Sequence, residues 1–190
     1  MNIIQIGCND GKDHVFDFIK QNQQNINKLI LIDANINCIE VCKEKYKDIP
    51  NVEYLHCAIM PNNQEYVNFY IPDNNELTNG HSSTLLSHLK NLNYSKVKEI
   101  KTPSKNLNSL FKEFNFKKID RLYIDTEGLD VDIIESIDFN AIEIDYLMFE
   151  YIHSDGYLTY GGSKLNNLVE KLKNLNYKIS NQEFNVIATK

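Results

Sequence analysis

The sequence predicts an α/β fold built around a mostly parallel sheet. Short apolar segments of strand length alternate with amphipathic segments of helical period along much of the 190-residue chain. Several apolar segments end in Gly, Asp or Glu, which is typical of strands that reach the ligand-binding edge of an open sheet. A strand–helix–strand order requires right-handed crossovers, and these make consecutive strands parallel. The length suits one domain, so we expect a single unit spanning residues 1–190.

The N-terminal third of the chain alternates between apolar runs of strand length and segments with the 3.6-residue period of a helix. Uninterrupted apolar runs predict buried strands, and apolar residues spaced three and four apart predict the helices between them. In chain order, we expect a strand at 2–6, a helix at about 13–21, a strand at 28–32, a helix at 36–46 and a strand at 52–58.

The middle of the chain departs from this alternation. Residues 66–71 alternate at period two, which predicts a strand with one solvated face. Residues 72–83 are rich in Asp, Asn, Gly and Ser and predict a loop. A short helix at 84–92 and a strand at 97–101 follow. We therefore expect a hairpin and loop inserted into the domain around residues 62–104.

The parallel alternation resumes after this insertion. Leucines at helical spacing near the C-terminus give the clearest 3.6-residue period of the chain. In chain order, we expect a helix around 107–114, strand 119–124, a helix around 131–137, strand 146–149, helix 165–175, and a closing hairpin of 177–179 and 184–188 around Asn181-Gln182.

Composition excludes some classes of partner. Lys and Arg total 20 against 26 Asp and Glu, for a net charge of −6, and Arg121 is the only arginine. A nucleic-acid binder usually gathers Lys and Arg on one face. No apolar run reaches the ~18 to 20 residues of a membrane span, and the N-terminus lacks the basic segment of a signal peptide. We expect a cytoplasmic protein with reduced cysteines and neither a nucleic-acid nor a membrane partner.

The first two strand ends carry the residues of a nucleotide-type site. Gly7 and Gly11 allow a tight turn close to a ligand, although their spacing is not the G-x-G-x-x-G dinucleotide fingerprint. Asp33 ends the second strand, where a carboxylate can accept hydrogen bonds from both hydroxyls of a ribose. Asp33 could instead cap the next helix, but Asn35 can serve as that cap and would leave Asp33 free. The combination favours an adenosine-containing cofactor over an ordinary turn.

Carboxylates also follow two later strands. Asp125 and Glu127 come after strand 119–124, and Glu150 ends strand 146–149, with His153 shortly beyond. Acids at a helix start can simply be stabilised by the helix dipole. Asp125, however, follows a buried run, where a carboxylate needs a partner such as a cofactor amine, a metal or a substrate hydroxyl.

Five segments together resemble the FkbM family of S-adenosylmethionine-dependent methyltransferases. The likeness covers nearly the whole chain, and its most specific part is the block at 119–130. The resemblance implies a Rossmann-like class I methyltransferase fold, a seven-stranded sheet with an antiparallel last strand. It also implies S-adenosylmethionine as cofactor and O-methylation of a hydroxyl on a sugar, a glycan or a small metabolite. The segments are I-Q-I-G-C-N-D-G (4–11), L-I-D-A-N (31–35), H-S-S-T-L (81–85), I-D-R-L-Y-I-D-T-E-G-L-D (119–130) and M-F-E-Y-I-H (148–153).

Position by position, the resemblance assigns roles to the residues at the strand ends. The glycine turn would hold the methionine part of the cofactor, Asp33 the ribose and Ala58 the adenine. Gln5 departs from the family pattern, because that position often holds an acid. The cofactor-binding candidates are Gly7, Cys8, Asn9, Asp10, Gly11, Asp33, Ala34, Asn35, Ala58 and Asp125.

A hydroxyl is a poor nucleophile at neutral pH, so a base or a metal should assist the reaction. We expect a metal-free reaction, and the alternative is a divalent cation held by carboxylates at the strand ends. The acceptor-binding candidates are His81, Ser82 and Ser83. The candidates for the base are Asp125, Glu127, Glu150 and His153, of which the three acids are the possible oxygen ligands.

Two other functions stay open. One is a non-catalytic cofactor-binding or assembly protein on the same fold, which the amide at Gln5 slightly favours. The other is a nicotinamide oxidoreductase, which the absent fingerprint disfavours. A homodimer is also plausible, because the strand at 66–71 would otherwise leave an unpaired edge.

Overall fold

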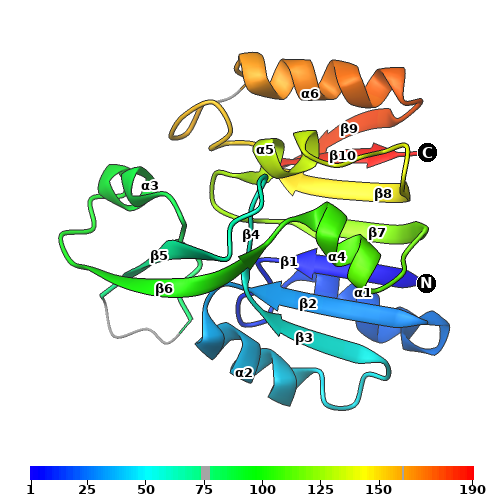
Figure 1. The fold of residues 1–190 in the computed structure, drawn as a ribbon, viewed down its shortest axis with the longest axis horizontal. Coiled ribbons are helices and arrows are strands. Elements are labelled where there is room, and N and C mark those ends of the chain that lie inside the picture. The colour runs from blue at the N-terminus through cyan, green and yellow to red at the C-terminus, as the bar shows by residue number, and fades with distance from the viewer. Residues whose placement is uncertain (74–77, 160) are drawn as a thin grey trace.

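A computed structural model describes residues 1–73, 78–159 and 161–190. Its central sheet has the strand order β3-β2-β1-β7-β8-β10-β9 (Figure 1). The pairs are parallel except those of β10, which runs antiparallel to β8 and β9. This confirms the predicted Rossmann-like fold. The strands are β1 (Asn2–Ile6), β2 (Lys28–Asp33), β3 (Val52–His56), β7 (Lys118–Ile124), β8 (Glu143–Glu150), β9 (Lys178–Gln182) and β10 (Asn185–Thr189).

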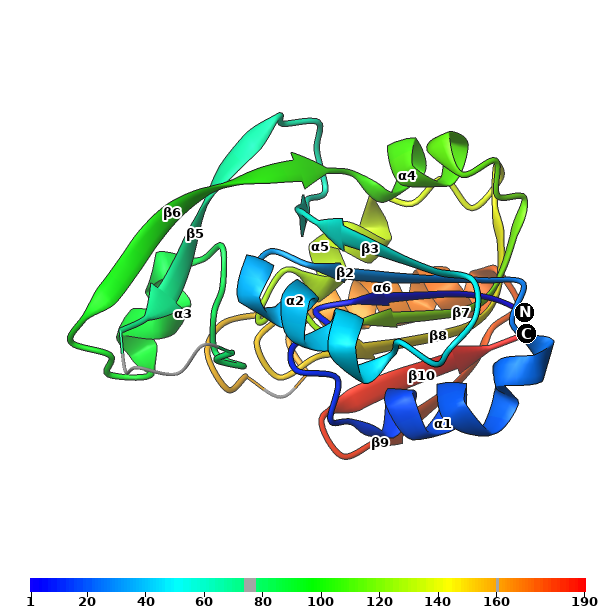
Figure 2. The same cartoon turned by 90° about the horizontal axis from the view of Figure 1, so that it is seen from below.

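Helices cover both faces of this sheet (Figure 2), which explains the long apolar run in the central strand β2. Alternate residues of one strand enter different cores: Ile3 packs with the α1 and α2 residues, whereas Ile4 packs with residues of α4, α5 and α6. One face carries α1 (His14–Asn22) and α2 (Ile36–Lys45), and the other carries α4 (Leu107–Glu113), α5 (Asp130–Glu135) and α6 (Ser163–Asn174).

The insertion forms a second, three-stranded sheet in the order β4-β6-β5. It consists of β4 (Ala58–Ile59), β5 (Tyr66–Pro72), the short helix α3 (Leu86–Asn91) and β6 (Val97–Lys105). β5, β6 and α3 project beyond the carboxyl ends of the central strands (Figure 1). Residues 74–77, inside the loop expected at 72–83, lie outside the described residues.

One sequence-based expectation about strand pairing stays a prediction and another needs correction. β5 pairs with β6 on one side and is bridged on the other only at Tyr70 and Ser83 among the described residues, so it is an edge strand and the homodimer stays a prediction. The closing hairpin turns at Glu183 and Phe184, whereas Asn181 and Gln182 belong to β9. Glu183 takes the left-handed conformation (φ 52°) that this turn requires, which the residue type gave no reason to expect.

The four cysteines are free and buried, in keeping with the expected reduced thiols. Among the described residues, no helix is long and apolar enough to cross a membrane.

The strand order reverses at β1, which pairs with β2 on one side and with β7 on the other. Gly7 leaves β1 with φ +75°, and the backbone N–H of Asp125 donates to the Ile6 carbonyl across the same junction. A Cβ added at Gly7 would lie 1.7 Å from the carbonyl oxygen of Asp125. Only glycine therefore fits at this switch point, where open α/β sheets bind ligands.

Replacement of Gly7 by alanine tests this close approach. We expect Gly7→Ala to lower the free energy of unfolding by at least ~3 kcal/mol, because the left-handed φ and the backbone overlap both oppose a side chain. Gly161→Ala is the matched control, since Gly161 has φ +78° but no atom within 4 Å of the added carbon. It should cost only about 1 kcal/mol. Urea unfolding of both variants measures the difference, and equal losses would contradict the proposed contact.

Candidate functional site

The β1–α1 turn and the end of β2 are joined by the carboxylate of Asp33. The backbone N–H of Asn9 donates to Asp33 Oδ2 (2.8 Å), and the N–H of Asn35 donates to Asp33 Oδ1 (2.8 Å). Asn35 caps α2 by accepting a bond from the Asn37 N–H, as the sequence suggested. Asp33 accepts these two backbone bonds and also lines the adjoining pocket, so its role towards a ligand stays a prediction.

A pocket opens beside these turns at the switch point. Its empty volume is about 720 Å³ including its mouth, within the size range of small-molecule sites. Of the predicted cofactor-binding residues, seven line it: Gly7, Asn9, Asp33, Ala34, Asn35, Ala58 and Asp125. Further lining residues that the sequence did not single out include Ile6, Cys38, Cys57, Ile59, Phe69, Asn79, Gly80, Thr84, Thr126 and Leu129.

Other predicted cofactor residues lie outside the lining and shape the turn. The Gly11 N–H donates to the carbonyl of Cys8, and Asp10 pairs with Lys12. Cys8 is fully buried against Cys42. Gln5, which departs from the family pattern, donates from Nε2 to Asp13 Oδ2 (2.7 Å). Because Asp13 also caps α1, Gln5 ties the first strand to the start of the helix that follows.

The turn after β7 is held in an unusual conformation. Glu127 has φ 56°, in the left-handed region that a non-glycine residue seldom adopts. Thr126 Oγ1 donates to Asp130 Oδ2 (2.7 Å), and the hydroxyl of Ser83 donates to the carbonyl of Glu127 (3.0 Å). Strained backbone of this kind persists when its surroundings over-determine it, and it recurs at functional sites.

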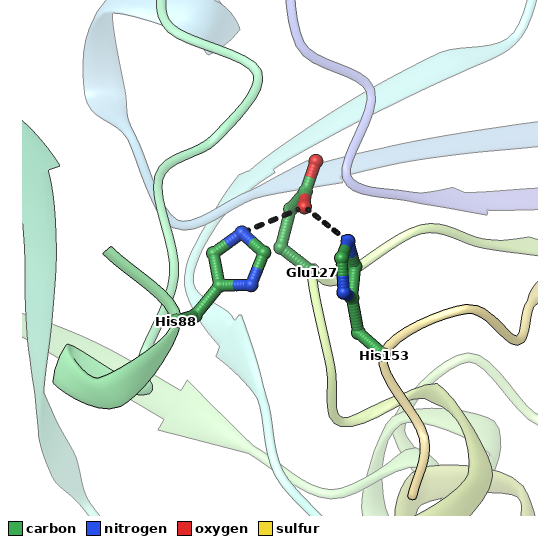
Figure 3. A group of neighbouring side chains, drawn as sticks. All are labelled: His88, Glu127 and His153. Atoms are coloured by element: carbon green, nitrogen blue, oxygen red, sulfur yellow. Dashed lines mark ion pairs between the residues drawn. The ribbon is translucent and has the colours of Figure 1, made fainter. Parts of the chain in front are cut away.

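Glu127 faces two histidines that come from different parts of the chain (Figure 3). Its Oε2 lies 3.0 Å from His88 Nε2 and 3.8 Å from His153 Nε2. The two imidazole rings are 4.6 Å apart edge to face, and the ring of Tyr157 stacks on His153 at 5.5 Å. His88 lies on α3, so the insertion supplies the third side chain of this group.

The three residues line a second hollow next to the first pocket. Glu127 and Leu129 line both, so the two spaces meet at these side chains. The rest of the second lining is mostly polar: Leu85, Ser87, His88, Asn91, Gly128, Asp132, His153, Ser154, Asp155, Gly156, Tyr157, Ser163 and Lys164.

Burial perturbs the ionisable groups around this junction. Desolvation raises the pKa of Asp33 to about 6, that of Glu127 to about 7 and that of Glu150 to about 9. Asp125 opens onto the first pocket, yet desolvation and neighbouring acids hold its pKa well above the usual range. Desolvation lowers the pKa of His153 to about 4, so its imidazole is neutral at pH 7.

The remaining predicted residues are placed less centrally. Glu150 lies outside both linings, and its buried Oε2 has no hydrogen-bond partner among the described residues. His81 is exposed, and its Nδ1 lies 2.7 Å from the hydroxyl of Tyr94. Ser82 lines the first pocket, whereas Ser83 supports Glu127 from behind. The sequence analysis missed His88, because nothing in its spacing indicates an approach to Glu127.

The residues of the first pocket fit an adenosine cofactor. Gly7 lines the space without a side chain, the buried carboxylate of Asp33 ends β2 beside it, and Ala58 and Ile59 add apolar surface. The acid Asp125, which opens onto the same space, suits a cationic ligand group.

The chain is similar to several solved structures. The FkbM methyltransferase of Methylobacillus flagellatus KT matches with a TM-score of 0.55 at 9% identity, covering 100% of this chain and 43% of that one. This chain therefore spans less than half the length of that protein. A SAM-dependent methyltransferase from Aquifex aeolicus (TM-score 0.44, 10% identity) is covered over 80% of its length by 99% of this chain. A Streptococcus mutans protein solved with SAH (TM-score 0.45, 12% identity) is covered over 88% of its length by all of this chain.

No curated protein matches the sequence. A family model for the methyltransferase FkbM domain, in contrast, matches residues 5–179, most of the chain. With the switch-point pocket and its glycine turn, this match shows that the chain belongs to the FkbM methyltransferase family and that its cofactor is S-adenosylmethionine.

Proposed function

We propose that this protein is an O-methyltransferase that acts on a hydroxyl of a sugar, a glycan or a small metabolite. The observation that carries the proposal is the meeting of two spaces at Glu127 and Leu129. A cofactor in the first and an acceptor in the second would approach each other beside a carboxylate. S-adenosylmethionine supplies a methyl group activated on a sulfonium sulfur, and alignment of the acceptor oxygen is then the main task of the protein.

In this proposal the first pocket binds the cofactor along the switch point. Asp33 accepts hydrogen bonds from the ribose hydroxyls through its remaining lone pairs. Ala58 flanks the adenine, and Gly7 with Asn9 brings backbone close to the methionine part. Asp125 faces the cationic end of the cofactor, where a carboxylate is favourable.

The second hollow suits a neutral, polyhydroxylated acceptor. Ser87 and Asn91 offer groups that both donate and accept hydrogen bonds. The Tyr157 ring adds an apolar face. The acid Asp132 is neutralised by Lys164 (2.8 Å). A net charge of −6 disfavours a phosphate backbone as the acceptor.

Among the candidate bases, Glu127 is the one that borders both spaces. Asp125 borders only the cofactor pocket, His153 only the acceptor hollow, and Glu150 neither. We assign Glu127 as the group that accepts the hydroxyl proton, with His153 beside it. His81, Ser82 and Ser83 would then act at the rim of the site or through the turn of Glu127.

A screen with isotopically labelled methyl donor tests the function directly. Free sugars, glycosides, nucleotide sugars and hydroxylated metabolites are incubated with the protein, and products are read by mass spectrometry. We expect a mass gain of one labelled methyl group on an oxygen of a polyol. Cofactor binding without transfer to any acceptor would favour the non-catalytic alternative, and reduction of NAD would favour the oxidoreductase.

Replacement of Glu127 separates catalysis from cofactor binding. We expect Glu127→Gln to lower kcat by roughly 10²- to 10⁴-fold, because the amide cannot accept the hydroxyl proton. The affinity for S-adenosylhomocysteine, measured by calorimetry, should change less than about 3-fold in the same variant. Glu143→Gln, at an exposed site on the opposite end of the sheet, is the control and should retain full kcat. An equal loss of kcat in both variants would remove Glu127 from this role.

The raised pKa of Asp33, about 6, gives cofactor binding a pH dependence. Below pH 6 the carboxyl becomes protonated and accepts hydrogen bonds poorly, so affinity for S-adenosylhomocysteine should fall as the pH drops from 7.5 to 5. We expect Asp33→Asn to bind roughly 10- to 100-fold more weakly at pH 7.5. Its affinity should vary little over the same pH range.

Asp48→Asn, at an exposed acid outside the pocket, is the matched control and should keep the wild-type pH profile. Melting temperatures without ligand report any damage to the turns that Asp33 supports. A pH profile that persists in Asp33→Asn would show that another group controls cofactor affinity.

A further inference from the structure

His88, Glu127 and His153 form a group of metal-ligating side chains built from three separate segments. Their ligand atoms all lie within 4.8 Å of one another. His88 comes from α3, Glu127 from the turn after β7, and His153 from the loop after β8. The Oε2 atom of Glu127 points between the two imidazoles, whereas its other oxygen points away (Figure 3).

The Nε2 atom of His88 makes no hydrogen bond within the described part of the chain that would account for its position. The side chain is 4% exposed. Nε2 lies 3.0 Å from the Glu127 carboxylate, but not in hydrogen-bonding geometry. A buried polar atom left in this state costs about 1 to 3 kcal/mol. It is aimed at the centre of the group, which indicates a partner there.

The spacing of the group matches the coordination sphere of a small cation. Zinc binds imidazole nitrogen and carboxylate oxygen at about 2.1 Å, so two ligands at tetrahedral angles lie roughly 3.4 Å apart. The two measured distances from Glu127, 3.0 and 3.8 Å, lie on either side of that value. Two ligands of one ion can be separated by no more than about 4.2 Å. The ligand atoms all lie within 4.8 Å of one another, so small side-chain rotations would bring the whole group into range.

We propose that His88, Glu127 and His153 form a binding site for a divalent transition-metal ion, with Zn²⁺ as the representative. Two imidazoles and one carboxylate are ligands that such ions prefer, whereas Mg²⁺ prefers oxygen ligands alone. Three protein ligands leave at least one position open, and the open side is the second hollow. In so far as that position would bind the acceptor hydroxyl, the inference rests on the proposed function. A metal bound there would take over from Glu127 the activation of the acceptor hydroxyl, in place of the metal-free reaction expected from the sequence.

The site requires one adjustment at His153. Its Nδ1 now lies 3.4 Å from the backbone N–H of Leu158, a long contact in which Nδ1 accepts. A metal at Nε2 needs the tautomer with hydrogen on Nδ1, so this contact would be lost. The alternative without a metal keeps it, with the His153 Nε2–H directed at Glu127.

Metal titration of the 190-residue chain distinguishes the two arrangements. After chelation and desalting, the protein is titrated with ZnCl₂ by calorimetry and, separately, with Co²⁺ by visible absorption. We expect one Zn²⁺ per chain and a Co²⁺ spectrum of a nitrogen- and oxygen-ligated ion, with no heat from MgCl₂. His88→Ala and His153→Ala should each weaken Zn²⁺ binding by at least ~100-fold and abolish the Co²⁺ spectrum.

His14→Ala, at the start of α1 and outside the group, is the matched control and should bind Zn²⁺ like the wild type. Each variant is also titrated with S-adenosylhomocysteine, because unchanged affinity shows that the fold is intact. Failure of the wild type to bind Zn²⁺, or equal binding by His88→Ala, would overturn the site in favour of the metal-free pair. Neither readout involves methyl transfer, so an inactive protein that binds Zn²⁺ would instead overturn the proposed function.

Discussion

The contact between Gly7 and the carbonyl of Asp125 is the constraint on which the rest of the site depends. β1 and β7 are neighbours whose following helices, α1 and α5, pack on opposite faces of the sheet. The chain must therefore leave the two strands in opposite directions, and the pocket occupies the space between the departing turns. A side chain at position 7 would force these strand ends apart. Both the turn that carries Asn9 and the turn that carries Glu127 are placed by this close approach.

The sequence predicted the residues whose position follows from local structure. The ends of β1, β2 and β7 could be located because apolar runs stop there, and residues at parallel strand ends share one edge of the sheet. Asn35 was recognised as a helix cap for the same local reason. The bond that Asp33 accepts from the Asn9 N–H could not be predicted, because it joins two turns that are remote in the sequence. A local sequence pattern does not show that Asn9 and Asp33 are close in space.

His88 could not be predicted for a related reason. It lies in a six-residue helix between loop segments, and its place depends on the length and pairing of β5 and β6. The Ser83 hydroxyl then anchors this insertion to the backbone of Glu127. Nothing in the sequence of such a segment indicates that tertiary structure brings its histidine close to a carboxylate. The sequence thus indicated many residues that line the first pocket and fewer that line the second hollow, because the insertion contributes His88 and part of the latter lining.

Several buried acids surround the site, and a positive charge nearby would stabilise their ionised forms. Burial raises the pKa of Asp125, Glu127, Asp130 and Glu150, and neighbouring acids raise it further for all of these except Asp130. Asp130 is already bonded to Thr126, so it needs no further partner. Asp125 opens onto the cofactor pocket, where a sulfonium and an amine would offset its charge. Glu127 faces two imidazoles that burial keeps neutral, so they do not neutralise it. A cation between these three side chains would balance Glu127 as the cofactor balances Asp125, and one junction would then hold two positive charges with separate tasks.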